Sequence, residues 1–89
     1  MRMTTSGTDQ QIEARVSGFI CELAGLEPGA LQADTPLLER GVVASLHVLE
    51  IADFLEHEFG VQLSALDVSP EQFRSVATIA ELVRAKVQG

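Results

Sequence analysis

The chain has 89 residues, of which 46% are hydrophobic, enough for one small domain with a modest core. Thirteen acidic residues against six basic ones give a formal net charge of -7, which repels nucleic-acid phosphates and anionic membrane surfaces. Four Phe residues without any Trp or Tyr leave few rings for stacking bases, so the composition argues against nucleic-acid binding and favours partners with basic patches.

The N-terminal stretch and the cysteine count predict a cytoplasmic protein. "MRMTTSGTDQQ" lacks the apolar core of a signal peptide, and no apolar run reaches membrane-spanning length. Cys21 is the only cysteine, so no intramolecular disulfide can form, which fits a reducing compartment. We therefore expect no membrane span.

The first helix is predicted from about Asp9 to Ala24, after a disordered tail of small polar residues at 1–7. Thr8 or Asp9 can cap its start. Gly25 can end it, because glycine takes the left-handed conformation that closes helices. The apolar residues with helical spacing, expected to face the core, are Ile12, Val16, Phe19, Ile20 and Leu23.

The next stretch, "LEPGALQADTPLLERG", holds two prolines and two glycines and is predicted to be a long loop. Its four leucines are expected to pin it onto the core: Leu26, Leu31, Leu37 and Leu38. A long ordered loop in a small domain is often functional.

A second helix is predicted from about Ser45 to Glu58, with Gly60 as its C-terminal stop. One apolar stripe, widened by two neighbouring residues, is expected to face the core: Leu49, Ala52, Leu55 and Phe59, with Val48 and Ile51.

After Gly60, "VQLSALDV" is predicted to be a short connector whose expected inward residues are Val61, Leu63 and Leu66.

The last third of the chain predicts a short helix and a longer one. In "SPEQF", Ser69 can cap, Pro70 suits the first helical position, and Gln72 fits a capping box. Ser75 can cap a final helix whose expected inward residues are Val76, Ile79, Leu82, Val83 and Val87. The whole pattern predicts an all-α fold: a four-helix bundle of three main helices and one short helix, with the long loop between helices one and two.

Catalytic and metal sites find little support in the sequence. Asp53 and His57 share a helix face, but their acidic surroundings fit a solvated surface better, and no HExxH or paired CxxC spacing occurs. Cys21 falls among core positions and is predicted to be a structural thiol. Ser45 and His47 lack the nucleophile elbow of a hydrolase. We therefore expect no catalytic residue and no metal site, and a protein that is not an enzyme.

Ser45 stands where the apolar periodicity of the second helix begins, and two readings are open. Its hydroxyl can cap the helix, which serine does often. Alternatively, it can carry a phosphodiester, since the free amides and positive dipole end of a helix N-terminus suit an anion.

The segment "DTPLLERGVVASLHVLEIADFLEHEFGVQL", followed by "SVATIAELV", resembles the heart of acyl and peptidyl carrier proteins. The resemblance covers roughly residues 9–87 and defines a carrier domain at 8–89. It implies that a phosphopantetheinyl transferase moves 4′-phosphopantetheine from coenzyme A onto Ser45. The thiol at the end of this cofactor then holds intermediates as thioesters. "GVVASL" is closer to free-standing aminoacyl carriers, including D-alanine carrier proteins, than to the fatty-acid type.

The resemblance also implies brief contacts with several enzymes: the transferase, an acyl- or aminoacyl-loading ligase, and downstream transferases. The expected partner-binding residues of this monomer are Leu46, Glu50, Asp53 and Glu56. His47 and His57 stand where the family often has acids, which would make docking pH-sensitive.

One position departs from the family pattern, because Ala44 precedes the serine where Asp is usual. Because this carboxylate is missing, an alternative function stays open: a carrier-like helical interaction module that is not loaded. A third reading is a small regulatory helix bundle, unrelated to carriers, in which Ser45 is an ordinary cap.

Overall fold

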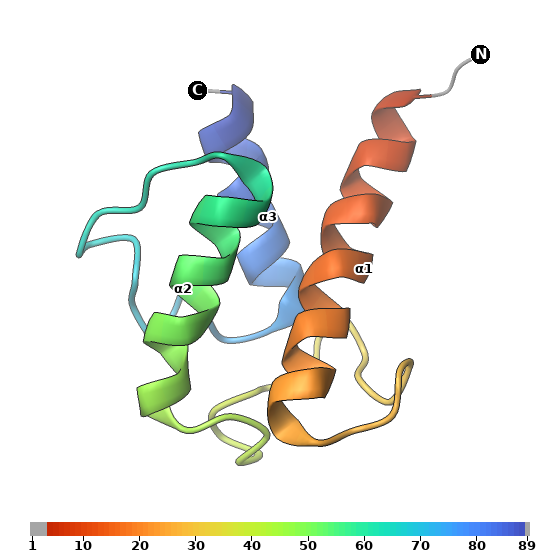
Figure 1. The fold of residues 1–89 in the computed structure, drawn as a ribbon, viewed down its shortest axis with the longest axis vertical. Coiled ribbons are helices and arrows are strands. Elements are labelled where there is room, and N and C mark those ends of the chain that lie inside the picture. The colour runs from red at the N-terminus through yellow and green to blue at the C-terminus, as the bar shows by residue number, and fades with distance from the viewer. Residues whose placement is uncertain (1–3, 89) are drawn as a thin grey trace.

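The computed structural model of the protein describes residues 4–88, with side chains over 11–44 and 46–87. It contains three helices, α1 (Thr4–Ala24), α2 (Ser45–Phe59) and α3 (Val76–Gln88), and residues 4–88 contain no strand (Figure 1). The all-α prediction is therefore confirmed. α1 packs more extensively against α3 than against α2. None of the described helices is long and apolar enough to cross a membrane.

The start of α1 differs from the prediction, whereas its end agrees with it. The helix begins at Thr4 rather than near Asp9, so the expected tail at 1–7 overlaps it; residues 1–3 lie outside the described residues. At the other end, Gly25 has a φ of 74°, and the Leu26 amide donates to the Cys21 carbonyl at 2.8 Å. This is the hydrogen bond of a glycine-closed helix terminus.

The short helix expected at "SPEQF" is not confirmed, because residues 60–75 contain only turns, bends and irregular chain. Ser69 does cap a single turn: its Oγ accepts from the Gln72 amide at 3.3 Å, and its carbonyl accepts from the Phe73 amide at 3.0 Å. The turn cannot continue, because Ser75 already caps α3 and little chain remains between the two serines. The fold is therefore a three-helix arrangement rather than the four-helix bundle we expected.

The core is formed by one apolar face of each helix and by four residues of the connecting segments, Leu37, Val43, Val61 and Phe73. Ile12, Val16 and Ile20 of α1 are buried as predicted. The largest fully buried side chain is Phe73, and Leu37 is also fully buried, so both connectors contribute to the core. The remaining buried core residues that were expected to face inward are Ile51, Ala52, Leu55, Val76, Ile79, Leu82 and Val83.

Three aromatic rings join α1 to α2 at the edge of this core. The rings of Phe19 and Phe54 are stacked, with centroids 4.2 Å apart, and Phe59 meets Phe54 edge-on at 6.2 Å. The guanidinium of Arg15 and the carboxylate of Glu58 form an ion pair across the same two helices. These contacts explain how α1 holds α2 although their backbones approach over a short stretch.

Four leucine and valine residues expected to face the core are exposed instead: Leu49, Leu66, Val87 and, less strongly, Leu26. Ile51 and Leu55, four residues apart, set the centre of the buried face of α2. Leu49 lies two residues before Ile51, which places it on nearly the opposite side of the helix, and it is 66% exposed.

We predict that Gly60→Ala destabilises the fold by about 1 kcal/mol or more, because Gly60 closes α2 with a φ of 67° that alanine adopts only under strain. Gly18→Ala is the matched control, since Gly18 is helical and a Cβ there meets nothing within 4 Å. It should stabilise by about 0.5–1 kcal/mol. Urea unfolding of both variants measures this, and a shift of equal sign would contradict the assignment of the Gly60 cap.

Candidate functional site

Ser45, the predicted attachment residue, is the first residue of α2, although its side chain lies outside the described part of the structure. The chain reaches it through a turn organised by Leu37. The Leu37 carbonyl accepts from the amides of Val42 at 2.9 Å and Val43 at 3.4 Å, and the Leu37 amide donates to the Arg74 carbonyl at 2.8 Å. The side chains of Leu37 and Val43 are buried, so both connectors together fix where α2 begins.

The residue before Ser45 is held by a histidine from within the helix. Ala44 has an extended backbone and no side-chain cap. Its amide donates to His47 Nδ1 at 3.0 Å, and its carbonyl accepts from the His47 amide at 2.8 Å. This role of His47 was not predicted from the sequence, although an acceptor side chain three residues after a cap position is the available signal.

The exposed face of α2 near Ser45 combines apolar and acidic side chains. Leu46 is 75% exposed and Leu49 is 66% exposed, while Glu50 and Asp53 are exposed on the same helix. The structure thus leaves three of the four predicted partner-binding residues accessible, Leu46, Glu50 and Asp53, and adds Leu49, which the sequence analysis assigned to the core.

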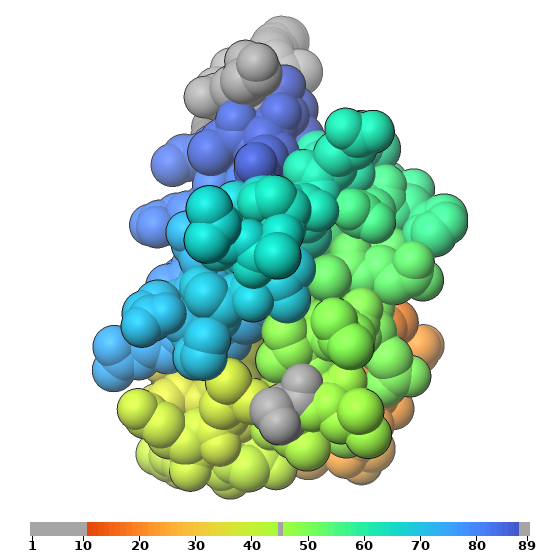
Figure 2. Space-filling model, turned by 90° about the vertical axis from the view of Figure 1, so that its left-hand side faces the viewer, coloured from red at the N-terminus to blue at the C-terminus, as the bar shows by residue number. Residues whose placement is uncertain are grey.

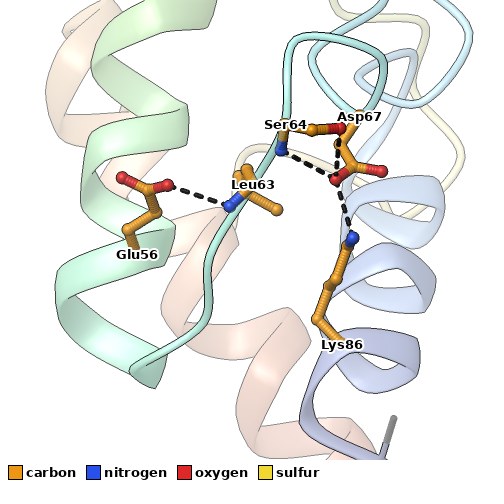
Figure 3. Close-up of polar contacts among 5 residues, drawn as sticks. All are labelled: Glu56, Leu63, Ser64, Asp67 and Lys86. Carbon is orange, nitrogen blue, oxygen red and sulfur yellow. Dashed lines mark hydrogen bonds and ion pairs between the residues drawn. The ribbon is translucent and has the colours of Figure 1, made fainter.

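Glu56, the fourth predicted partner-binding residue, is half-buried and makes an internal contact. Its Oε2 accepts from the Leu63 amide at 2.9 Å, which ties the end of α2 to the α2–α3 connector (Figure 3). The carboxylate therefore contributes to the fold, and a partner that binds it has to share or displace this hydrogen bond.

The same connector is fastened to α3 by Asp67. Its Oδ2 accepts from the Ser64 amide at 2.9 Å and the Ser64 hydroxyl at 3.1 Å, and it lies 2.7 Å from Lys86 Nζ (Figure 3). The lysine, followed by the Ser64 amide, holds the pKa of the Asp67 carboxyl below its usual value. Asp67 thus orders the connector that borders α2.

Two other groups were considered for chemistry, the Asp53–His57 pair for metal binding and Cys21 as a nucleophile, and both have structural surroundings. The imidazole Nδ1 of His57 lies 2.9 Å from the carbonyl of Asp53 and 3.4 Å from its carboxylate. The hydrogen bond to the Asp53 carbonyl raises the pKa of His57, and the charge of the Asp53 carboxylate raises it further by a smaller amount. Cys21 is buried and free, as a structural thiol should be. Within the described residues, no group of three His, Cys, Asp or Glu side chains could hold a metal ion.

α2 and the two connectors meet on one face of the molecule (Figure 2). A groove of about 260 Å³ lies between the connectors and is lined by Pro36, Leu38, Glu39, Pro70, Glu71 and Arg74. Leu38 and Glu39 belong to the turn that leads to α2. The candidate site is therefore a helix N-terminus whose preceding connector lines an apolar groove with charged walls.

The arrangement of a long connector, a serine at a helix start and an acidic exposed helix face is that of a carrier protein. A family profile described as "Phosphopantetheine attachment site" matches residues 14–85. The chain is also similar to the "Probable acyl carrier protein PigG" of Serratia sp. (strain ATCC 39006), with 31% identity over 58 residues, 65% of this chain and 67% of that protein. The chain therefore belongs to the phosphopantetheine-attachment family of acyl and peptidyl carrier proteins.

Membership settles several expectations. Carrier domains are not catalytic, and their cofactor is covalently attached 4′-phosphopantetheine, which supplies the reactive thiol. They work with transferases and synthetases. The reading as a regulatory bundle unrelated to carriers is wrong, because the family profile spans most of the chain.

The described residues fit such a group at the start of α2. The first turn of α2 contains no acidic residue, and Ala44 offers no side-chain acceptor. A phosphodiester at this terminus therefore meets the positive helix end without a competing carboxylate from that turn.

We predict that the stabilisation supplied by Asp67 is lost in acid. Because the folded-state pKa lies below the ordinary value of 3.8, the contribution is fully present above that value and disappears as the pH falls through the folded pKa. Asp67→Asn should lower the urea midpoint at neutral pH, and the deficit should shrink in acid. Asp34→Asn, at an exposed position, is the control. A deficit that persists unchanged in acid would contradict the role of the ionised carboxylate.

Proposed function

We propose that the protein is a free-standing carrier that holds an acyl or aminoacyl group as a thioester on 4′-phosphopantetheine attached to Ser45. The observation that carries this proposal is the place of Ser45, the first residue of α2 within the stretch matched by the family profile. The similar protein from Serratia, a probable acyl carrier protein, supports a carrier role of this kind.

The physical contribution of such a protein is the fixed position of a mobile arm. The helix N-terminus stabilises the phosphodiester, and the tether raises the effective concentration of the cargo at each enzyme in turn. The polypeptide provides no acid, base or nucleophile for the thioester chemistry, which belongs to the cofactor thiol.

We define the docking face as Leu46, Leu49, Glu50 and Asp53, all exposed on α2. The leucines supply apolar contact and the carboxylates attract basic patches, so a partner can bind quickly and leave again. The proposed partners are a phosphopantetheinyl transferase, a loading ligase and downstream transferases. Glu56 contributes to the field of this face, although its Oε2 is engaged by the Leu63 amide.

We also propose that the carrier acts as a monomer in the cytoplasm. Its one cysteine is buried, so neither an internal disulfide nor a surface thiol ties it to an oxidising compartment.

Ala44, which stands where the family usually has Asp, is the reason to consider a second function. A family member without the usual Asp before the serine can serve as an interaction module that is never loaded, with the exposed leucines as its binding surface. Loading of Ser45 distinguishes the two functions directly.

We predict that incubation with coenzyme A and a broad-specificity phosphopantetheinyl transferase adds one phosphopantetheine to the intact mass, and that Ser45→Ala abolishes the gain. Ser69→Ala is the matched control, because Ser69 also stands at a turn start but its Oγ accepts from the Gln72 amide. Both variants should stay folded, since a lost cap costs about 0.5–2 kcal/mol.

Absence of a gain with several transferases, followed by a gain in Ala44→Asp, would show that the transferase requires the Asp. Absence in both proteins would support the module that is not loaded. A gain in the Ser45→Ala protein would place the attachment on another residue.

We predict that Glu50→Lys with Asp53→Lys slows loading roughly tenfold at low salt, because steering by this face is electrostatic. Glu27→Lys with Glu81→Lys changes the net charge equally at exposed positions away from α2 and should have a smaller effect. The difference between the two double variants should narrow at about 1 M salt, where the Debye length falls to about 3 Å. Equal slowing by both would place docking elsewhere.

A further inference from the structure

We propose that His47 is a positioning residue for the modification of Ser45, and that it fixes the helix start in a chain that lacks the Asp before the serine. This inference rests on the proposed function, because it concerns the reaction at Ser45. Ala44 has no side chain that could accept from the amides of the first turn, so the side-chain contact at this helix start is the reciprocal one, from the Ala44 amide to His47.

The geometry involves both backbone groups of Ala44. Its N–H donates to His47 Nδ1 at 3.0 Å, and its C=O accepts from the His47 amide at 2.8 Å. Ser45 lies between these two residues in the chain, so the two hydrogen bonds close a small loop around it. In a capping box, a Glu or Gln at this third position reaches back to the cap amide; here the imidazole does so.

The preceding chain is held separately, which gives the loop a fixed base. The Leu37 carbonyl accepts from the amides of Val42 and Val43, and Val43 is buried. Ala44 is the next residue and is exposed. Without the His47 contact, its amide has no partner among the described residues, and the end of the helix next to the nucleophile would fray. A frayed start lowers the fraction of molecules in which Ser45 has the geometry that the transferase needs.

The contact specifies the tautomer of His47. Nδ1 accepts from the Ala44 amide, so in the neutral ring the proton must reside on Nε2. His57, the only other histidine of the chain, provides an internal contrast. Its Nδ1 lies 2.9 Å from the Asp53 carbonyl, which can only accept, so this nitrogen carries a proton.

α3 supplies a matched comparison for the energetic effect. Thr78 is the third residue of α3, and its Oγ1 accepts from the amide of the cap residue Ser75 at 3.0 Å. His47 and Thr78 thus make the same kind of contact at two different helix starts, of which only one contains the attachment serine. Thr78→Ala removes a reciprocal cap without touching the site.

The first experiment is a long-range proton–nitrogen correlation spectrum of the imidazoles of the full-length protein at mildly alkaline pH. We expect an unprotonated Nδ1 for His47 and a protonated Nδ1 for His57. A protonated Nδ1 on His47 would overturn the proposal, whatever the outcome of loading.

The second experiment measures the kinetics of Ser45 modification by mass in the wild type, His47→Ala, His47→Gln and Thr78→Ala. We expect His47→Ala to lower kcat by roughly two- to tenfold, in line with one lost hydrogen bond, with little change in KM. His47→Gln should recover most of the rate, because its amide oxygen can accept from the Ala44 amide. Thr78→Ala should lower the thermal midpoint while leaving kcat unchanged.

Several outcomes would contradict the positioning role. If Gln fails to rescue, or if His47→Ala raises KM and leaves kcat unchanged, His47 is a docking contact. If Thr78→Ala slows the reaction as much as His47→Ala, the effect is one of general stability. If neither the wild type nor Ala44→Asp is modified by any transferase, the proposed function fails and the positioning role with it. If Ala44→Asp alone is modified, the positioning role fails by itself, because His47 then does not make Ser45 reactive. The spectra judge the hydrogen bond separately.

Discussion

The turn built on Leu37 is the constraint on which the rest of the site depends. Its buried side chain anchors the α1–α2 connector, its amide binds the segment before α3, and its carbonyl gathers the chain that enters α2. This one residue therefore links the long connector to both later helices. Such a link matters in a small domain, because the core is modest and each buried contact is a large part of it. The start of α2, and with it the backbone of Ser45, is therefore held by contacts of both connectors.

The α2–α3 connector follows the same logic without a helix of its own. Phe73 anchors it in the core, Glu56 holds it to α2, and Asp67 with Lys86 holds it to α3. The carboxylates of Glu56 and Asp67 therefore do more than make the surface soluble or attract partners, because they also hold the connector backbone in place. The acidic composition of the chain serves two purposes at once: part of it fixes the connector, and the exposed part on α2 remains available to partners.

The sequence predicts the features that depend on local periodicity and caps. The buried face of α1, the buried face of α3 apart from Val87, the Gly25 terminus and the Ser75 cap agree with the structure for that reason. The short helix fails because the spacing of Ser69 and Ser75 allows one turn only. Leu49 belongs to the main apolar stripe that the spacing predicts, but the core forms on the side of Ile51 and Leu55, and the spacing does not show where the partner helices lie. The contacts of Glu56 and Asp67 join residues separated in the chain, which periodicity does not reveal.

Attachment at Ser45 can be tested by fragmentation of the loaded protein after tryptic digestion, which localises the cofactor. Cleavage after Arg40 and Arg74 leaves one peptide that contains three serines, Ser45, Ser64 and Ser69. Since the structure engages Ser64 and Ser69 in turn contacts and places Ser45 at the start of α2, the account predicts the phosphopantetheine on Ser45 alone. A modified peptide whose fragments place the group on Ser64 or Ser69 would contradict it.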